Sequence, residues 1–166
     1  EGVNPNKFVP VWFRSFDPYI LTKAPIIATA GLIFVTTSEG LYALDTNGND
    51  AWHYPTELPL GHAPTVVDGV AYVGGHDRMV HAINIQTGKA IWKFKGAASG
   101  FGTNPLVVNN TVYIGNRDGF MYAINATSGA QKWKFETVGP ITYSAAYDSK
   151  NDTIFFAAGD SHAYAL

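Results

Sequence analysis

The stretch MYAINATSGAQKWKFET, residues 121–137, has the pattern of two β-strands joined by a polar turn. Two similar stretches precede it, GLYALDTNGNDAWHY at 40–54 and HAINIQTGKAIWKF at 81–94. In all three stretches a glycine lies four places before a tryptophan; these glycines are Gly48, Gly88 and Gly129. The chain therefore repeats one unit, and the period of that unit decides the fold.

The period is close to 40 residues, because the tryptophans at positions 12, 52, 92 and 133 are 40, 40 and 41 residues apart. One unit resolves into four short strand-like segments separated by Gly, Asn and Asp turns, for example 64–68, 70–75, 79–84 and 90–95. Four strands in a period near 40 indicate a propeller blade. We interpret Trp12, Trp52, Trp92 and Trp133 as structural anchors that pack one blade against the next.

The sequence predicts an all-β fold, a β-propeller of about four four-stranded antiparallel blades in a single domain spanning residues 1–166. The expected blades cover approximately 24–61, 63–102, 104–142, and 144–166 completed by 8–16. Completing the last blade with the first strand would leave no sheet edge unpaired. The first strand matches imperfectly, because Arg14 stands where the other copies have an aromatic residue. Two geometries therefore stay open: a closed four-blade ring, or half of a ring of about eight blades completed by a second chain.

Composition excludes several classes of protein. The formal net charge is -2 without any block of basic residues, so no nucleic-acid partner is expected. The absence of cysteine excludes disulfides and thiolate metal sites. No apolar run reaches the roughly 18 residues of a membrane-spanning helix. We therefore expect no membrane span.

The turns of the predicted meander sort candidate residues onto two ends of the propeller. The loops between third and fourth strands are tight Asn, Thr and Gly turns. The opposite, loop-rich end is the better candidate for binding, because loops on a rigid scaffold commonly carry function. Equivalent positions just before each innermost strand should surround the channel mouth: Lys23, His62, Thr103 and Tyr143. The neighbouring turns add His76, Asp77, Arg78, Arg117 and Asp118 as candidate ligand-binding residues.

No catalytic constellation emerges from the sequence. His62, His76 and His162 come from different repeats and share no ligand spacing, so no metal site is predicted. Asp160, Ser161 and His162 are sequence neighbours, and a hydrolytic triad needs convergence from separate segments. We therefore expect a non-enzymatic binding module or scaffold without a cofactor, which recognises a protein or cell-surface partner through its loop-rich end. The sequence also leaves open a homodimer.

The repeated pattern of aromatic residue, Ala, aliphatic residue, Asp or Asn, turn, Gly and Trp resembles the pyrroloquinoline-quinone-like (PQQ-like) repeat of quinoprotein-type propellers. The resemblance covers nearly the whole chain and implies the propeller fold. It also implies a location outside the cytoplasm, periplasmic or secreted. Members include alcohol and sugar dehydrogenases, an outer-membrane assembly lipoprotein and secreted binding modules.

The chain departs from the dehydrogenases of this family. Those enzymes resemble one another in about eight blades and a vicinal cysteine pair, and this chain has no cysteine. Their calcium ligands and catalytic Asp have no motif that matches here. The alternative function is therefore a fragment or half-ring of a quinone (PQQ)-dependent dehydrogenase, and only this alternative implies PQQ and calcium.

Overall fold

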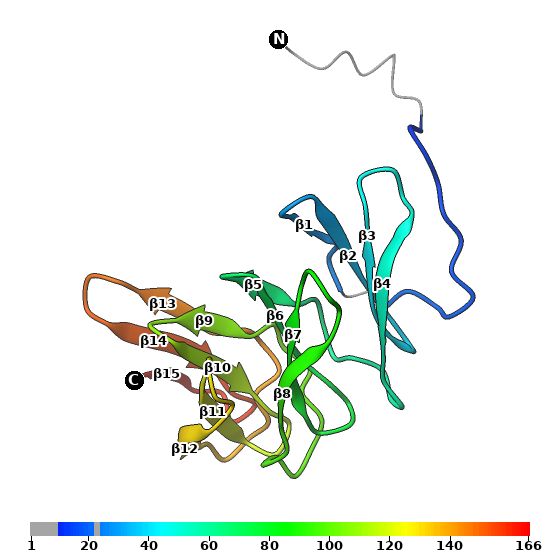
Figure 1. Cartoon of the computed structure of the whole chain (residues 1–166). Helices are drawn as coiled ribbons and strands as arrows, with labels where there is room; N and C mark the ends of the chain where they lie inside the picture. Colours follow the sequence, from blue (N-terminus) through cyan, green and yellow to red (C-terminus); the bar gives the residue numbers. More distant parts are fainter. Residues whose placement is uncertain (1–9, 22–23) are drawn as a thin grey trace, which may run out of the picture.

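The computed structural model describes residues 10–21 and 24–166, and the strands among them form four antiparallel sheets (Figure 1). The first sheet contains β1 (Ile27–Thr29), β2 (Leu32–Thr37), β3 (Gly40–Leu44) and β4 (Asp50–Pro55). The second contains β5 (Thr65–Val67), β6 (Val70–Gly74), β7 (Val80–Asn84) and β8 (Ala90–Phe94). The third contains β9 (Leu106–Val108), β10 (Thr111–Gly115), β11 (Phe120–Asn125) and β12 (Gln131–Glu136). The fourth contains β13 (Ala146–Asp148), β14 (Thr153–Ala157) and β15 (Ala163–Ala165). The predicted all-β propeller class is confirmed.

Each sheet is a meander whose strand register repeats. In the first three sheets an alanine of the third strand faces the tryptophan of the fourth; the pairs are Ala43 with Trp52, Ala82 with Trp92, and Ala123 with Trp133. A register shift follows directly after each of these alanines. The sequence repeat is therefore a structural repeat down to the position of its β-bulge.

The hydrophobic core lies between successive sheets. Phe34, Leu60 and Val73 belong to the cluster between the first and second sheets. Equivalent clusters fill the two later interfaces; they include Phe101, Ile114 and Tyr122, and then Met121, Ile141 and Phe156. The middle strands carry apolar residues on both faces because both faces are covered, as in a sheet stacked between neighbours.

Tryptophan and glycine lock the first sheet to the second and the second sheet to the third. The Trp52 indole donates a hydrogen bond of 2.7 Å to the Ile85 carbonyl, and a Cβ added to Gly88 would lie 2.7 Å from its ring. Trp92 repeats this geometry one sheet further along, with a bond of 2.8 Å to the Ala126 carbonyl. Glycine is thus required at this position for two reasons: Gly88 has a positive φ of 66°, and an aromatic ring lies directly on it.

Trp12 makes the same contact at the beginning of the described chain. Its indole donates to the Thr46 carbonyl at 3.0 Å and its ring lies over Gly48. Arg14 fixes the segment further through an ion pair of 2.7 Å with Asp50. Residues 10–16 therefore occupy the place of the outer strand of a blade preceding the first sheet, although they form no strand themselves.

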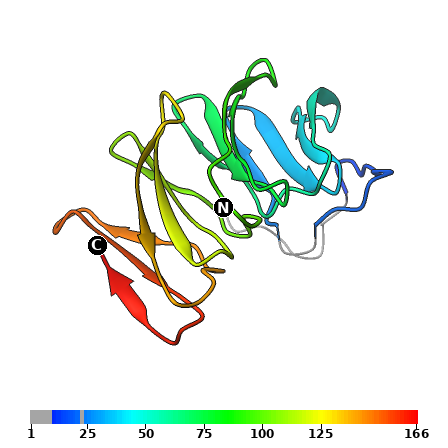
Figure 2. The same ribbon diagram turned by 90° about the horizontal axis from the view of Figure 1, so that it is seen from below.

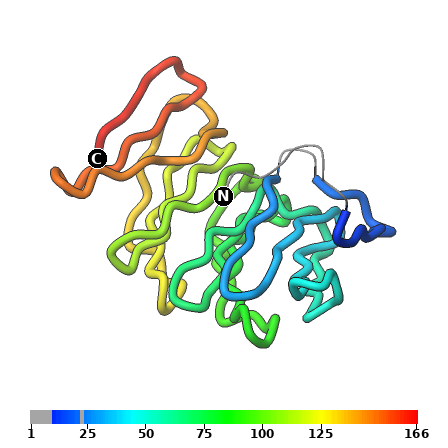
Figure 3. Tube along the Cα trace, turned by 90° about the horizontal axis from the view of Figure 1, so that it is seen from above, coloured from blue at the N-terminus to red at the C-terminus, as the bar shows by residue number. Residues whose placement is uncertain are grey.

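The sheets follow one another along an open arc, from β1–β4 at one end to β13–β15 at the other (Figures 2 and 3). The expected completion of 144–166 by 8–16 is not observed: the fourth sheet has three strands. Residues 10–16 are held by the first sheet, at the opposite end of the arc, and residues 8 and 9 lie outside the described part of the chain. Residues 10–16 and the fourth sheet therefore lie at opposite ends of an open arc.

Candidate functional site

Each link between two sheets makes backbone contacts just after the second strand of the sheet that follows it. These contacts hold the loops of the loop-rich end in place. Isolated bridges join Leu60 to Gly75 and Phe101 to Asn116. In the fourth sheet the Gly159 amide donates to the Pro140 carbonyl at 2.8 Å. Leu60 and Phe101 are fully buried, so each link is anchored by an apolar side chain beside its backbone contact.

Three of these links and one turn enclose a cavity of about 390 Å³, which we call the mouth pocket. Its lining residues are Gly61, His62, Gly102, Arg117, Thr142 and Tyr143. Two of the links approach each other so closely that only glycine fits at position 61, because a Cβ on Gly61 would collide with the Phe101 carbonyl. The sequence-predicted residues His62, Arg117 and Tyr143 are thus brought together from three different repeats.

The mouth pocket is cationic. None of its six lining residues carries a carboxylate, and Arg117 forms no ion pair with any carboxylate in the described part of the chain. Burial lowers the pKa of nearby His76, and the positive charge of Arg117 lowers it further. An anionic group entering the pocket would therefore meet an exposed guanidinium.

The remaining candidate residues lie apart from this pocket. Thr103 is buried and donates its hydroxyl to the Gly115 carbonyl, so it braces the third sheet instead of lining the mouth. Lys23 lies outside the described residues. Asp77 and Arg78 line a separate hollow beside Lys95, and His76 lies near the Gly100 backbone.

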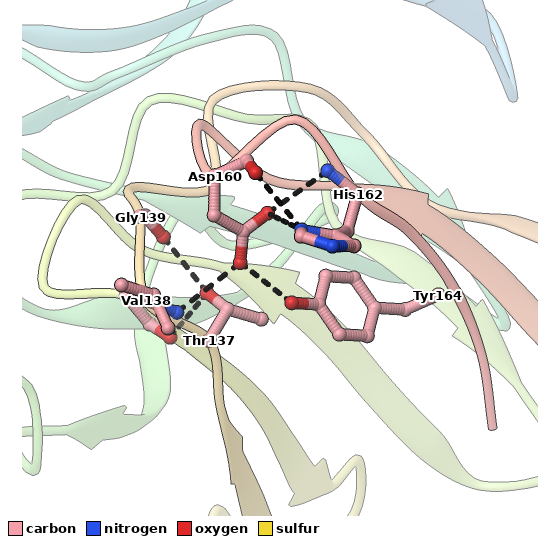
Figure 4. Close-up of polar contacts among 7 residues, drawn as sticks. Thr137, Val138, Gly139, Asp160, His162 and Tyr164 are labelled. Carbon is pink, nitrogen blue, oxygen red and sulfur yellow. Dashed lines mark hydrogen bonds and ion pairs between the residues drawn. The ribbon is translucent and has the colours of Figure 1, made fainter.

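Aspartates of the loop-rich end join a tyrosine of their own sheet to a backbone amide of the preceding link, and we call this arrangement a latch. In the fourth sheet Asp160 accepts hydrogen bonds from the Tyr164 hydroxyl at 2.5 Å and from the Val138 amide of the preceding link at 3.2 Å (Figure 4). The bond from Tyr164, and then the amides of His162 and Val138, lower the pKa of Asp160. The same bond raises the pKa of Tyr164.

Asp118 repeats this latch in the third sheet. It accepts from the Tyr122 hydroxyl at 2.8 Å and from the Ala98 amide at 3.0 Å. Burial raises the pKa of Tyr122, and the hydrogen bond to Asp118 raises it further. The predicted binding residue Asp118 is therefore engaged inside the fold. The signal for the latch was an Asp four residues before the aromatic residue of the repeat, which sequence reasoning missed.

Asp77 is engaged in a related way, with His81 in place of the tyrosine. His81 is buried; its Nε2 lies 3.0 Å from the Asp77 carboxylate and its Nδ1 lies 3.0 Å from the Tyr54 hydroxyl. Burial alone would raise the pKa of Asp77, but the hydrogen bond and charge of His81 and the Met79 amide lower it. This chain of polar groups bridges the first and second sheets.

The opposite end of the molecule holds a larger cavity, of about 500 Å³, between the second and third sheets. Its walls are mainly apolar and include Val67, Tyr72, Ile91 and Val107, with Asn109 at its edge. Sequence reasoning assigned only tight turns to this end. The sequence shows that β5 and β9 are apolar, as the walls of this cavity are. It does not predict the cavity itself, because the space between two sheets depends on their packing angle.

Within residues 10–21 and 24–166, no group of three or more His, Cys, Asp or Glu side chains is arranged to hold a metal ion. The same part of the chain contains no helix with the length and apolar character needed to cross a membrane.

Comparison with known proteins identifies the family. Residues 37–166 match the family model described as "Outer membrane protein assembly factor BamB". A curated relative, the quinoprotein ethanol dehydrogenase of Pseudomonas aeruginosa, is 31% identical over 109 residues. This alignment covers 58% of the present chain and 18% of the relative, so the chain spans less than a fifth of that enzyme.

Solved structures show the same fold. The computationally designed protein Ika4 superposes with a TM-score of 0.80 at 14% identity, covering 93% of this chain and 94% of that one. BamB from Moraxella catarrhalis superposes with a TM-score of 0.78 at 23% identity, covering 94% of this chain and 48% of that one. The repeat, the stacked sheets and these matches agree: the chain belongs to the PQQ-like repeat family described as outer membrane protein assembly factor BamB.

Proposed function

We propose that this chain is a non-enzymatic binding module that recognises a protein partner through its loop-rich end, with an acidic group of that partner held in the mouth pocket. The observation that carries the proposal is the convergence of three links and the β10–β11 turn on one cationic cavity. The family description, an assembly factor for outer membrane proteins, supports a protein as the partner. It also supports a location outside the cytoplasm.

The lining residues suit a carboxylate. The guanidinium of Arg117 offers paired donors that match both carboxylate oxygens. Tyr143 is 74% exposed and adds an aromatic surface with a hydroxyl at the same opening. A side-chain or terminal carboxylate on a protein surface would satisfy both residues, whereas a basic peptide would meet the charge of Arg117 unfavourably.

The titratable groups around the pocket support binding over catalysis. The carboxylates of Asp118 and Asp160 each hold a tyrosine hydroxyl and a backbone amide of a link. A general acid or base must be within reach of the proton it transfers. These carboxylates are committed to fastening the fold, and the pocket itself contributes no carboxylate.

A quinone-dependent dehydrogenase fragment is the second candidate, because the Pseudomonas aeruginosa relative is a quinoprotein. Calcium prefers carboxylate and carbonyl oxygens, and the side chains of the mouth pocket supply no carboxylate beside the charge of Arg117. These residues do not fit a calcium-bound quinone. If the second candidate were right, titration with PQQ and calcium would give a saturable change in the absorbance spectrum.

Binding of an acidic peptide tests the proposal. A fluorescent hexaglutamate peptide, titrated and followed by anisotropy at low salt, should bind the chain more tightly than a hexalysine peptide. Arg117→Gln should weaken binding by about ten- to a hundredfold, the value of a charge-assisted hydrogen bond. Lys150→Gln makes the same change of charge at the exposed β13–β14 turn and is the matched control. Equal affinities for the two variants would refute the proposed pocket.

A further inference from the structure

One alanine distinguishes the interface between the second and third sheets from the interface before it. The residue after the third strand offers its carbonyl to the tryptophan of the preceding sheet, and this residue is Ile85 in the second sheet and Ala126 in the third. The Ile85 side chain is 5% exposed and belongs to the core cluster between the first and second sheets. Ala126 has no side-chain atom beyond Cβ, so the equivalent space in the next interface is left unfilled.

The cavity of about 500 Å³ lies at this position, and we call it the inter-sheet cavity. β5 and β9 lie side by side along it (Figure 1). The Ala126 amide donates to the Asn110 carbonyl at 3.1 Å, and the Thr127 hydroxyl donates to the Asn110 side-chain oxygen at 2.9 Å. These bonds hold two turns of its rim together. The cavity is thus formed without a ligand, and its volume is typical of small-molecule sites, which occupy about 300–1,000 Å³.

The charge of the inter-sheet cavity is negative. Asp68, on the β5–β6 turn, is the one charged residue among those that line it. In the described part of the chain, the Asp68 carboxylate forms no ion pair and accepts no hydrogen bond. Burial raises the pKa of Tyr72, and the charge of Asp68 raises it further, so the carboxylate acts on the same space as this hydroxyl. The Tyr72 hydroxyl itself donates to the Ala126 carbonyl at 3.3 Å.

We propose that the inter-sheet cavity binds a small organic amine, with the apolar body of the amine against the walls and its ammonium group at the Asp68 carboxylate. The aliphatic side chains of Val67, Ile91 and Val107 favour an apolar body, because each contact removes apolar surface from water. Charge then decides between ligands of the same shape, since a neutral molecule gains nothing from Asp68 and an anion is repelled by it. The proposal is independent of the mouth pocket, which lies at the other end of the molecule.

Three ligands of similar shape and different charge test this site. The ¹⁵N-labelled chain is titrated at neutral pH with 2-phenylethylamine, 2-phenylethanol and 3-phenylpropionate. The amine should shift the amide signals of Ile91 and Val107 in a saturable manner and bind most tightly, and the acid should bind least. Absence of a saturable shift with the amine, or equal affinities for amine and alcohol, would overturn the proposal. Tighter binding of N-acetyl-lysine methylamide than of 2-phenylethylamine would also overturn it, because a protein side chain would then be the better ligand.

Removal of the Asp68 charge tests the position of the ammonium group. Asp68→Asn should weaken binding of the amine about five- to tenfold, between the values of an exposed ion pair and of a charge-assisted hydrogen bond, and should leave binding of the alcohol unchanged. Asparagine tolerates the positive φ of 49° at this position. Glu57→Gln removes an exposed carboxylate from the link before β5 and is the matched control. Equal weakening in the two variants would contradict the role of Asp68.

Filling the inter-sheet cavity tests where the apolar body lies. Ala126→Ile gives the third sheet the side chain that Ile85 provides in the second, and should abolish binding of both the amine and the alcohol. Ala130→Ile adds the same atoms at an exposed position outside the lining and should leave both affinities unchanged. Urea unfolding of each variant shows whether it is folded. Full binding by a folded Ala126→Ile variant, or equal losses in the two variants, would place the amine elsewhere and overturn the proposal.

Discussion

Replacing Gly88 by alanine should destabilise the protein far more than the same replacement at Gly69. Both glycines have positive φ angles, 66° at Gly88 and 77° at Gly69, so either alanine incurs the cost of the left-handed conformation, about 1–2 kcal/mol. A Cβ at Gly69 would meet nothing within 4 Å, whereas a Cβ at Gly88 would lie 2.7 Å from the ring of Trp52. Gly69→Ala therefore isolates the backbone cost.

The ring of Trp52 cannot easily retreat. Its indole donates to the Ile85 carbonyl at 2.7 Å, and its ring lies 5.8 Å, centroid to centroid, from the ring of Phe34. Overpacking of such a contact costs about 1–3 kcal/mol. We therefore expect a loss of about 2–5 kcal/mol for Gly88→Ala, against about 1–2 kcal/mol for Gly69→Ala.

Urea unfolding followed by far-ultraviolet circular dichroism measures both free energies. The clash predicts further that Trp52→Ala, which removes the Cγ and Cδ2 atoms lying 2.7 Å from a Cβ at Gly88, partly relieves Gly88→Ala, so that the double variant loses less stability than the sum of the single variants. Equal losses for Gly88→Ala and Gly69→Ala would refute the interlock of tryptophan and glycine as the contact that joins the sheets.

Two further predictions concern the aspartate latches. Asp160→Asn should destabilise the chain near neutral pH; because the pKa of Asp160 is lowered in the folded state, its contribution is present above the unfolded value of 3.8 and is lost as the pH falls. The difference in unfolding free energy between parent and variant should therefore shrink on acidification in a urea titration repeated at several pH values, and a constant difference would contradict this role. Tyr122→Phe should cost about 1.5–3 kcal/mol, since the buried hydroxyl donates to a carboxylate. Tyr113→Phe, in the neighbouring strand of the same sheet, is the control and should cost little; similar losses in the two variants would argue against the latch.

The sequence predicted the repeating parts of the structure well. The expected strands 64–68, 70–75, 79–84 and 90–95 correspond to β5 to β8, because alternating strand and turn residues act locally. Trp12, Trp52 and Trp92 each lie over a glycine of the following unit, as expected of large apolar residues at a fixed period that pack between equivalent units; Trp133 is 36% exposed.

The closure of the ring and the aspartate latches could not be predicted from the local sequence pattern. Closure depends on the angle between stacked sheets, which the packing of Trp52 and Trp92 over the glycines sets. The latches join carboxylates to the backbone amides of Ala98 and Val138, and an amide carries no sequence signal. The sequence assigned Arg117 to the loop-rich end, but its proximity to Tyr143 arises because the β10–β11 turn and the link before β13 line the same cavity.

The order of the sheets along an open arc is the central structural claim, and a pair of spin-label distances tests it most directly. The chain has no native cysteine, so labels can be placed at Thr29 and Asn110, and separately at Thr29 and Lys150. Thr29 is the last residue of β1, and the other two positions lie on turns of the third and fourth sheets. Measured by pulsed electron resonance within one chain diluted in unlabelled protein, the distance from Thr29 to Lys150 should exceed the distance from Thr29 to Asn110. The reverse order would show that the first and fourth sheets are neighbours in a closed four-blade ring, and would contradict the open arc.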